Sequence, residues 1–141
     1  MKSIESLIPH RDPFLHIDRL VELNDQHCLA IKSINPDDPI FRGHFPGMPT
    51  YPGVLLVEAM GQAAGCHMAN EKGERTQFFL AKGEAARFLQ PVDPHVGDLY
   101  VKATFQKSKS VFTVYDCKVY NEKQVFAKTC IWLAVVPNPV T

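Results

Sequence analysis

The segment from Val54 to Met68 constrains the fold most strongly, because as a helix it would be apolar around almost its whole circumference. Only Glu58, Gln62 and His67 carry polar side chains in this stretch. A helix that is apolar on all sides has to be covered on all sides. We therefore predict a helix over about Pro52–Asn70, enclosed by a sheet that the rest of the chain builds around it.

The segments outside this helix have the two-residue period of strands. Between Leu99 and Gln106, apolar side chains alternate with more polar ones, as in a strand with one buried face. We predict further strands over Phe14–Leu23, Cys28–Ile34, Val111–Tyr120 and Gln124–Val136, turns at Lys107–Ser110 and Asn121–Lys123, and a polar loop over Asn70–Thr76. Residues 1–141 thus form one α+β domain, in which a curled antiparallel sheet of five or six strands wraps one long central helix.

Composition and charge exclude several classes of protein. Fifteen basic and fifteen acidic side chains give a formal net charge of zero, which argues against a nucleic-acid partner. No stretch reaches the roughly 18 apolar residues of a membrane span, and Met1–Pro9 is too poor in apolar residues for a signal peptide, so we expect a cytoplasmic protein. The four cysteines lack metal-ligand spacing, and so do the histidines, so we predict no metal.

Glu58 is the first candidate for chemistry. Its helical neighbours include no basic residue and are apolar or small apart from one amide: Val54, Leu55, Gly61, Gln62 and Gly65. A carboxyl group in apolar surroundings has a raised pKa, which suits proton transfer near neutral pH. Gln62, one turn later, is placed to hydrogen-bond Glu58, with a capping or interface role as the alternative. Glu58 could instead be an ordinary exposed helix carboxylate.

A loop rich in glycine and proline precedes the helix and contains His44. Pro52 is expected at the first helical position, so that Gly53 and Val54 open the helix with backbone N–H groups that lack intrahelical partners. Such donors can stabilise an oxyanion or enolate, and a substrate can approach Gly53 closely because it has no side chain. A simple helix entry turn is the alternative interpretation of the same residues.

Several short motifs extend over nearly the whole chain: P-H-R-x-P-F-L at Pro9–Leu15, G-H-F-P-G at Gly43–Gly47, P-G-V-L at Pro52–Leu55, E-A-M-x-Q at Glu58–Gln62, and weaker R-F and G-D pairs at Arg87–Phe88 and Gly97–Asp98. In these motifs the chain resembles the FabZ family, the (3R)-hydroxyacyl-acyl-carrier-protein dehydratases of fatty acid synthesis. The related FabA dehydratase/isomerases carry Asp where this chain has Glu58, which favours a dehydratase without isomerase activity.

The resemblance implies a hot-dog fold and a reaction that needs no cofactor. A 3-hydroxyacyl thioester on the phosphopantetheine arm of acyl carrier protein would lose water and become a trans-2-enoyl thioester. The resemblance makes His44 the base that removes the C2 proton. Glu58 would protonate or position the departing C3 hydroxyl, directly or through a water, and the N–H of Gly53 would hold the thioester carbonyl. It also implies homodimers in which two subunits share each site, and further assembly into hexamers.

Some positions depart from the family pattern. Ala85, Leu89 and Gln90 stand where the family commonly has basic residues, so contacts with the usual carrier protein are expected to differ. These changes suggest a dehydratase of a dedicated pathway, such as synthesis of a polyene or another secondary acyl chain.

Arg11, Lys82 and Arg87 are candidates for a basic rim that meets an acidic carrier protein, or else are simply solvated charges. Two other functions are possible at this point. A hot-dog acyl thioesterase would also use a helix carboxylate but would hydrolyse the thioester, and a non-catalytic acyl-binding subunit would keep only the fold.

Overall fold

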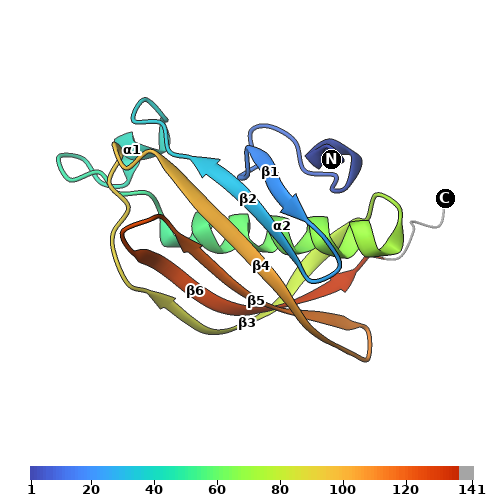
Figure 1. Cartoon of the computed structure of the whole chain (residues 1–141). Coiled ribbons are helices and arrows are strands. Elements are labelled where there is room, and N and C mark those ends of the chain that lie inside the picture. Colours follow the sequence, from blue (N-terminus) through green and yellow to red (C-terminus); the bar gives the residue numbers. More distant parts are fainter. Residues whose placement is uncertain (137–141) are drawn as a thin grey trace.

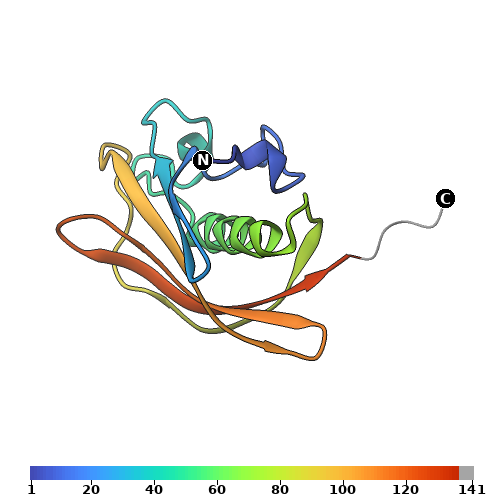
Figure 2. The ribbon, with the colours of Figure 1, turned by 45° about the vertical axis from the view of Figure 1, so that its right-hand side comes forward.

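A long helix, α2 (Gly53–Lys72), lies against the concave face of a six-stranded antiparallel sheet (Figure 1). The computed structural model describes residues 1–136. A turned view shows the sheet bending around the helix, while the N-terminal segment lies on the side that the sheet leaves open (Figure 2). This arrangement confirms the predicted α+β hot-dog fold.

The strands follow the spatial order β1-β2-β4-β5-β6-β3, so β1 and β3 form the two edges of the sheet. Their bounds are β1 (Arg19–Leu23), β2 (His27–Ser33), β3 (Phe78–Phe88), β4 (Asp98–Lys109), β5 (Phe112–Tyr120) and β6 (Val125–Val135). A 3₁₀ turn at Ile4–Ser6 and a short helix, α1 (Ile40–Gly43), precede α2.

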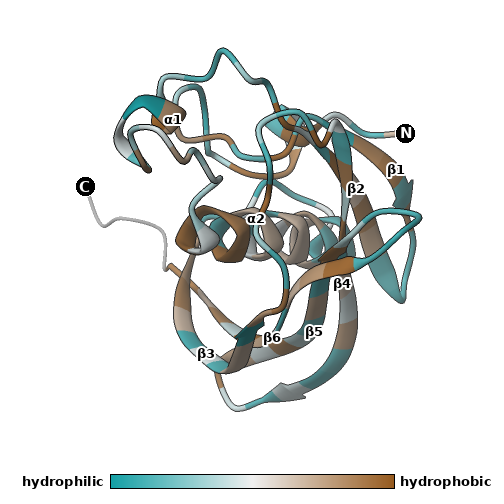
Figure 3. Cartoon of the chain, turned by 90° about the vertical axis from the view of Figure 1, so that its left-hand side faces the viewer, coloured by the Kyte–Doolittle hydropathy of each residue, from teal (hydrophilic) through white to brown (hydrophobic). Residues whose placement is uncertain are grey.

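The core forms between α2 and the concave face of the sheet. The helix is buried without interruption from Ala59 to Ala69, and the strands around it alternate between hydrophobic and hydrophilic residues (Figure 3). Small residues let the helix lie close to the strands. A β-carbon at Gly65, for example, would lie 2.1 Å from ring atoms of Phe78 at the start of β3, so the close approach at this point requires glycine.

The helix ends later than predicted. It continues past Asn70 to Lys72, and Gly73 then adopts the left-handed conformation with φ 75°. The backbone N–H of Gly73 donates to the carbonyl of Ala69 at 2.9 Å, which satisfies one of the last helical carbonyls. The polar loop is therefore shorter than Asn70–Thr76. No helix within residues 1–136 is long and apolar enough to cross a membrane.

The first predicted strand is also shorter than expected, because β1 begins at Arg19 and not at Phe14. The segment before it is held by a side chain of α2. The N–H of His16 donates to Gln62 Oε1 at 2.7 Å, and the carbonyl of Phe14 accepts from Gln62 Nε2 at 2.9 Å. These backbone groups therefore bond to the helix where a strand would bond to its neighbour.

Two further differences concern the sheet. The turn predicted at Lys107–Ser110 is shorter, because a register shift between Phe105 and Lys107 lets β4 continue pairing with β5 as far as Lys109. Strand β3 was not predicted. It contains two irregularities in its pairing with β6 and a positive φ of 51° at Ala85, which together break the two-residue period.

Candidate active site

His44 lies in the loop between α1 and α2, and its ring has one fixed hydrogen bond. Nδ1 of His44 lies 2.9 Å from the carbonyl oxygen of Thr50. Because a carbonyl oxygen only accepts, Nδ1 carries the hydrogen and donates it. Nε2 is then left with a free lone pair, which is the form that a general base requires.

The same loop is held at both ends. The N–H of Thr50 donates to the carbonyl of His44 at 2.9 Å, and the N–H of Tyr51 donates to the carbonyl of Val92 at 3.0 Å. The hydroxyl of Thr50 donates to the same Val92 carbonyl at 3.3 Å. These bonds tie the histidine loop to the segment that follows β3, so the imidazole is positioned by two parts of the chain.

The start of α2 presents backbone donors beside this loop. Pro52 is the residue that precedes the helix, with φ −61° and ψ 131°, so it stands one position earlier than predicted. As expected, Gly53 and Val54 open the helix, and the first backbone bond around the turn runs from the N–H of Leu55 to the carbonyl of Pro52 at 3.1 Å. The N–H groups of Gly53 and Val54 therefore precede the intrahelical bonds and can face a ligand.

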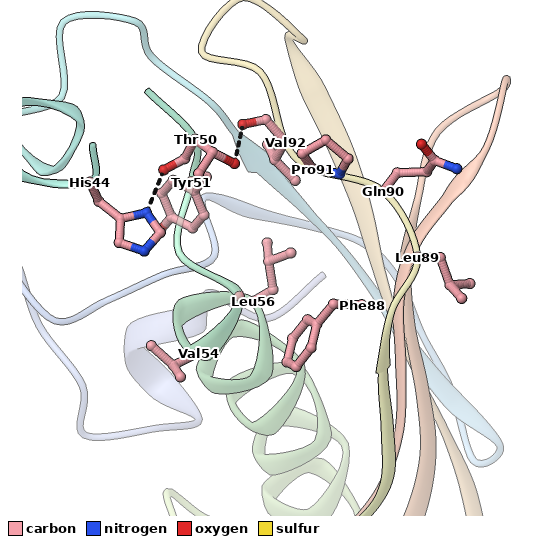
Figure 4. A pocket seen from close by; sticks show the side chains of 11 residues that line it. His44, Thr50, Tyr51, Val54, Leu56, Phe88, Leu89, Gln90, Pro91 and Val92 are labelled. Atoms are coloured by element: carbon pink, nitrogen blue, oxygen red, sulfur yellow. Dashed lines mark hydrogen bonds between the residues drawn. The ribbon is translucent and has the colours of Figure 1, made fainter. Parts of the chain in front are cut away.

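A pocket of about 390 Å³ lies between these parts. His44, Gly53 and Val54 line it on one side, and the segment from Phe88 to Val92 lines it on the other (Figure 4). A β-carbon at Gly53 would lie 2.7 Å from the ring of Phe88, so glycine is needed to keep this ring beside the helix start. The walls are mostly apolar, with His44, Thr50 and Tyr51 on one side and Gln90 on the other (Figure 4), as in a site where a few polar groups orient an apolar ligand.

Glu58 is not among the residues that line this pocket. Its Oε2 accepts a hydrogen bond from Gln62 Nε2 at 3.0 Å and lies 3.7 Å from His10 Nε2. The predicted bond between Glu58 and Gln62 is confirmed. The prediction that no basic residue shares the helix face of Glu58 is correct for the helix itself, but folding brings His10 from the N-terminal segment against this face. Within one chain, the structure thus brings His44, Gly53 and Val54 together in one place and Glu58 with Gln62 in another.

His10 is the neighbour of Glu58 that the sequence reasoning missed. Its ring packs against Phe14 and Phe78, with centroid distances of 6.5 and 5.3 Å. Burial lowers the pKa of His10 below its ordinary value, and the nearby Glu58 carboxylate opposes this shift. The signal that could have indicated this position is the P-H-R-x-P-F-L motif, which begins at Pro9.

Comparisons with known proteins identify the family of this chain. A family model described as FabA-like domain matches residues 8–130. The 3-hydroxyacyl-[acyl-carrier-protein] dehydratase FabZ of Streptococcus uberis is 34% identical over 137 residues, which covers 96% of this chain and 96% of that protein. The bifunctional enzyme LpxC/FabZ of Chlorobaculum tepidum is 36% identical over 141 residues, covering 96% of this chain and 30% of that longer protein.

Among solved structures, the dehydratase heterocomplex ApeI:P from Xenorhabdus doucetiae resembles this fold with a TM-score of 0.80. The likeness covers 98% of this chain and 93% of that chain at 16% identity, so it concerns the fold alone. The family model and the FabZ sequences go further, because they span most of the chain at substantial identity. The chain therefore belongs to the FabA-like family and, within it, to the FabZ group of 3-hydroxyacyl-[acyl-carrier-protein] dehydratases.

Proposed function

We propose that this chain removes water from a 3-hydroxyacyl thioester carried by acyl carrier protein, with His44 as the base. The observation that carries the proposal is the bond from His44 Nδ1–H to the carbonyl of Thr50 at 2.9 Å. It leaves the lone pair of Nε2 available beside the exposed N–H groups of Gly53 and Val54. A base and oxyanion donors in one mostly apolar pocket suit removal of a proton next to a thioester carbonyl.

The proposed steps use each group once. His44 Nε2 takes the proton from C2, and the negative charge that develops on the thioester oxygen is met by the N–H of Gly53. The C3–O bond then breaks, the C2–C3 double bond forms, and the hydroxyl leaves as water with a proton from Glu58. General acid or base groups contribute roughly 10²- to 10⁴-fold each, and one oxyanion donor about 10²- to 10³-fold.

We further propose that Glu58 acts in the site of a second subunit. The pocket that contains His44 does not include Glu58 of the same chain. In addition, β3 is an edge strand of 11 residues, and its apolar side chains Phe79, Leu80 and Phe88 are about half exposed. A long exposed apolar edge favours pairing with another copy. A homodimer joined along β3 would cover this edge and bring the partner subunit's Glu58 to the pocket.

Product analysis tests the reaction. We expect purified protein to convert 3-hydroxyacyl carrier protein into the enoyl carrier protein, which mass spectrometry detects as the loss of one water. Release of free acid and carrier thiol would identify a thioesterase instead. No conversion of hydroxyacyl carriers of any chain length would support a non-catalytic subunit.

Subunit mixing tests the shared site. His44→Ala and Glu58→Ala should each abolish activity. Random pairing of the two variants makes about half of the dimers hybrids, and each hybrid contains one intact site of two, so about one quarter of wild-type activity should return. Mixtures of two differently tagged His44→Ala chains are the control and should stay inactive. No recovery despite verified exchange of subunits would place both residues of one site on the same chain.

Three further parts of the proposal rest on the sequence interpretation alone. They are a cytoplasmic location, the assembly of dimers into hexamers, and a role in a dedicated pathway such as polyene synthesis. Assays with saturated and unsaturated hydroxyacyl carriers would distinguish a dedicated pathway from general fatty acid synthesis.

A further inference from the structure

Four basic side chains form one continuous row across the convex face of the sheet. Lys102 on β4 pairs with Lys118 on β5, Lys118 pairs with Lys128 on β6, and Lys128 pairs with Arg87 on β3. Residues directly opposite each other in an antiparallel sheet point to the same face. We call Arg87, Lys102, Lys118 and Lys128 the cationic row.

The cationic row faces away from the helix. Its neighbours along the strands, such as Val101, Val119 and Ala127, are fully buried in the core. Successive side chains of a strand point to opposite faces, so the row lies on the outer face. Arg87 and Lys128 are exposed and the other two are partly exposed, which leaves all four accessible from outside.

No acid forms an ion pair with this row among residues 1–136. None of its four members belongs to an ion pair of the described chain. Of the acids nearest along the strands, Glu84 pairs with Lys82, while Asp116 lines a hollow with Arg87 and Lys128 and accepts a hydrogen bond from Gln106 at 3.0 Å. One carboxylate beside four cations leaves the row with a net positive charge. The chain has no net charge, so the row is a local concentration of positive charge and not part of a generally basic surface.

This arrangement acts against the stability of the sheet. Like charges placed directly opposite each other on neighbouring strands are destabilising, by up to about 1 kcal/mol per pair relative to neutral residues. The row contains three such pairs in succession. A surface that is retained at the expense of folding is typical of a binding surface.

The row also ends beside the pocket. Arg87 immediately precedes Phe88, which lines the pocket from the other face of β3. Apart from His44, the residues that line the pocket include no basic side chain, and Leu89 and Gln90 occupy its wall. Of the three residues predicted for a basic rim, Arg87 belongs to the row, Arg11 donates to backbone carbonyls of the N-terminal segment, and Lys82 is paired with Glu84.

We propose that the cationic row is the docking surface for an acidic face of the acyl carrier protein, whose substrate arm reaches the pocket past the C-terminal end of β3, where Phe88 begins the pocket wall. This inference rests on the proposed function, since that function supplies a carrier-linked substrate. Charge complementarity favours this partner, because a row of four cations across four strands, none of them in an ion pair, fits an extended acidic protein surface. A second copy of the chain that presented the same face would meet the row with positive charge and be repelled.

The test compares two substrates with the same acyl group, one linked to acyl carrier protein and one to N-acetylcysteamine. We expect the double variant Lys118→Gln/Lys128→Gln to lower kcat/KM for the carrier-linked substrate about tenfold, mainly through KM. The small thioester should react at the wild-type rate. Added salt should lower the carrier-linked rate of the wild type more steeply than that of the variant.

The matched control is Lys107→Gln/Lys109→Gln, which removes the same charge from the same face. These two lysines lie at the far end of β4, 5.9 and 5.8 Å from the centre of the Trp132 ring. The control should keep kcat/KM for both substrates within about twofold. Urea unfolding should show that the row variant is at least as stable as the wild type, because repulsion has been removed.

The proposal is overturned if the row variant lowers both substrates equally, if it lowers neither, or if the control has the larger effect. Titration of labelled carrier protein measures its binding directly, so the docking surface can be tested even if the proposed dehydratase function fails. If the wild type converts neither thioester, weaker carrier binding by the row variant still supports the docking surface. The proposal is also overturned if the row variant binds carrier protein as the wild type does but has lost binding to duplex DNA or to phosphatidylglycerol vesicles.

Discussion

Replacement of Gln62 by leucine should destabilise the protein through loss of a buried hydrogen-bond network. The side chain of Gln62 is fully buried and bonds to the His16 N–H, the Phe14 carbonyl and the Glu58 carboxylate. Gln62→Leu leaves the two backbone groups without their partner, at about 1–3 kcal/mol each. The added apolar burial returns roughly 1–2 kcal/mol. We therefore expect the free energy of unfolding to fall by about 3 kcal/mol.

Urea unfolding at fixed protein concentration measures this change, with the fluorescence of the single tryptophan, Trp132, as the signal. Met60→Leu is the matched control, because Met60 is fully buried in the same helix and a swap of similar volume costs less than about 1.5 kcal/mol. A loss of less than roughly 0.5 kcal/mol in Gln62→Leu, which is within the usual effect of surface substitutions, would refute the view that this side chain anchors the N-terminal segment.

Three further predictions concern the site and its pH dependence. Gly53→Ala keeps the backbone N–H but adds a methyl group that should hold the thioester carbonyl away from it, and we expect kcat/KM to fall up to about 10²-fold in a steady-state assay. Thermal unfolding should change little because the exposed ring of Phe88 can turn away, and wild-type activity would contradict close approach of the substrate at Gly53. His10→Phe should keep kcat within about threefold at pH 8, because a neutral imidazole 3.7 Å from Glu58 lies beyond hydrogen-bond length, and a loss of more than tenfold would show a catalytic role. Burial lowers the folded-state pKa of His10 and His16, so the unfolded chain binds more protons below about pH 6.5 and the free energy of unfolding should fall between pH 7 and 5. His16→Phe should flatten that decline in urea titrations, and an unchanged slope would exclude His16 as a source.

The sequence predicted those elements whose period was regular. The apolar segment around Met60 required a covered helix, and the alternation in β4 required a strand with one buried face. Strand β3 was missed because its pairing with β6 shifts twice, once around Ala85. An irregular strand has no constant period that local pattern reasoning could detect.

In the candidate site, too, the sequence predicted what lies close together along the chain. The Gly/Pro loop and the helix start indicated His44, Gly53 and Val54 from the sequence, and the structure places them in one pocket. The helical spacing of Glu58 and Gln62 also predicted their hydrogen bond. Spacing along the chain was enough to predict these neighbours, because the residues belong to one continuous segment.

By itself, the sequence determined the covered helix, the wrapping sheet, the family resemblance and the residues that we propose for the chemistry. Only the tertiary structure placed His10 against Glu58 and aligned Arg87 with lysines from three other strands. Such contacts depend on strand order and register, which are set by how all the elements pack together. Periodicity within a segment records which face of that segment is buried, but it carries no information about which distant residue lies opposite.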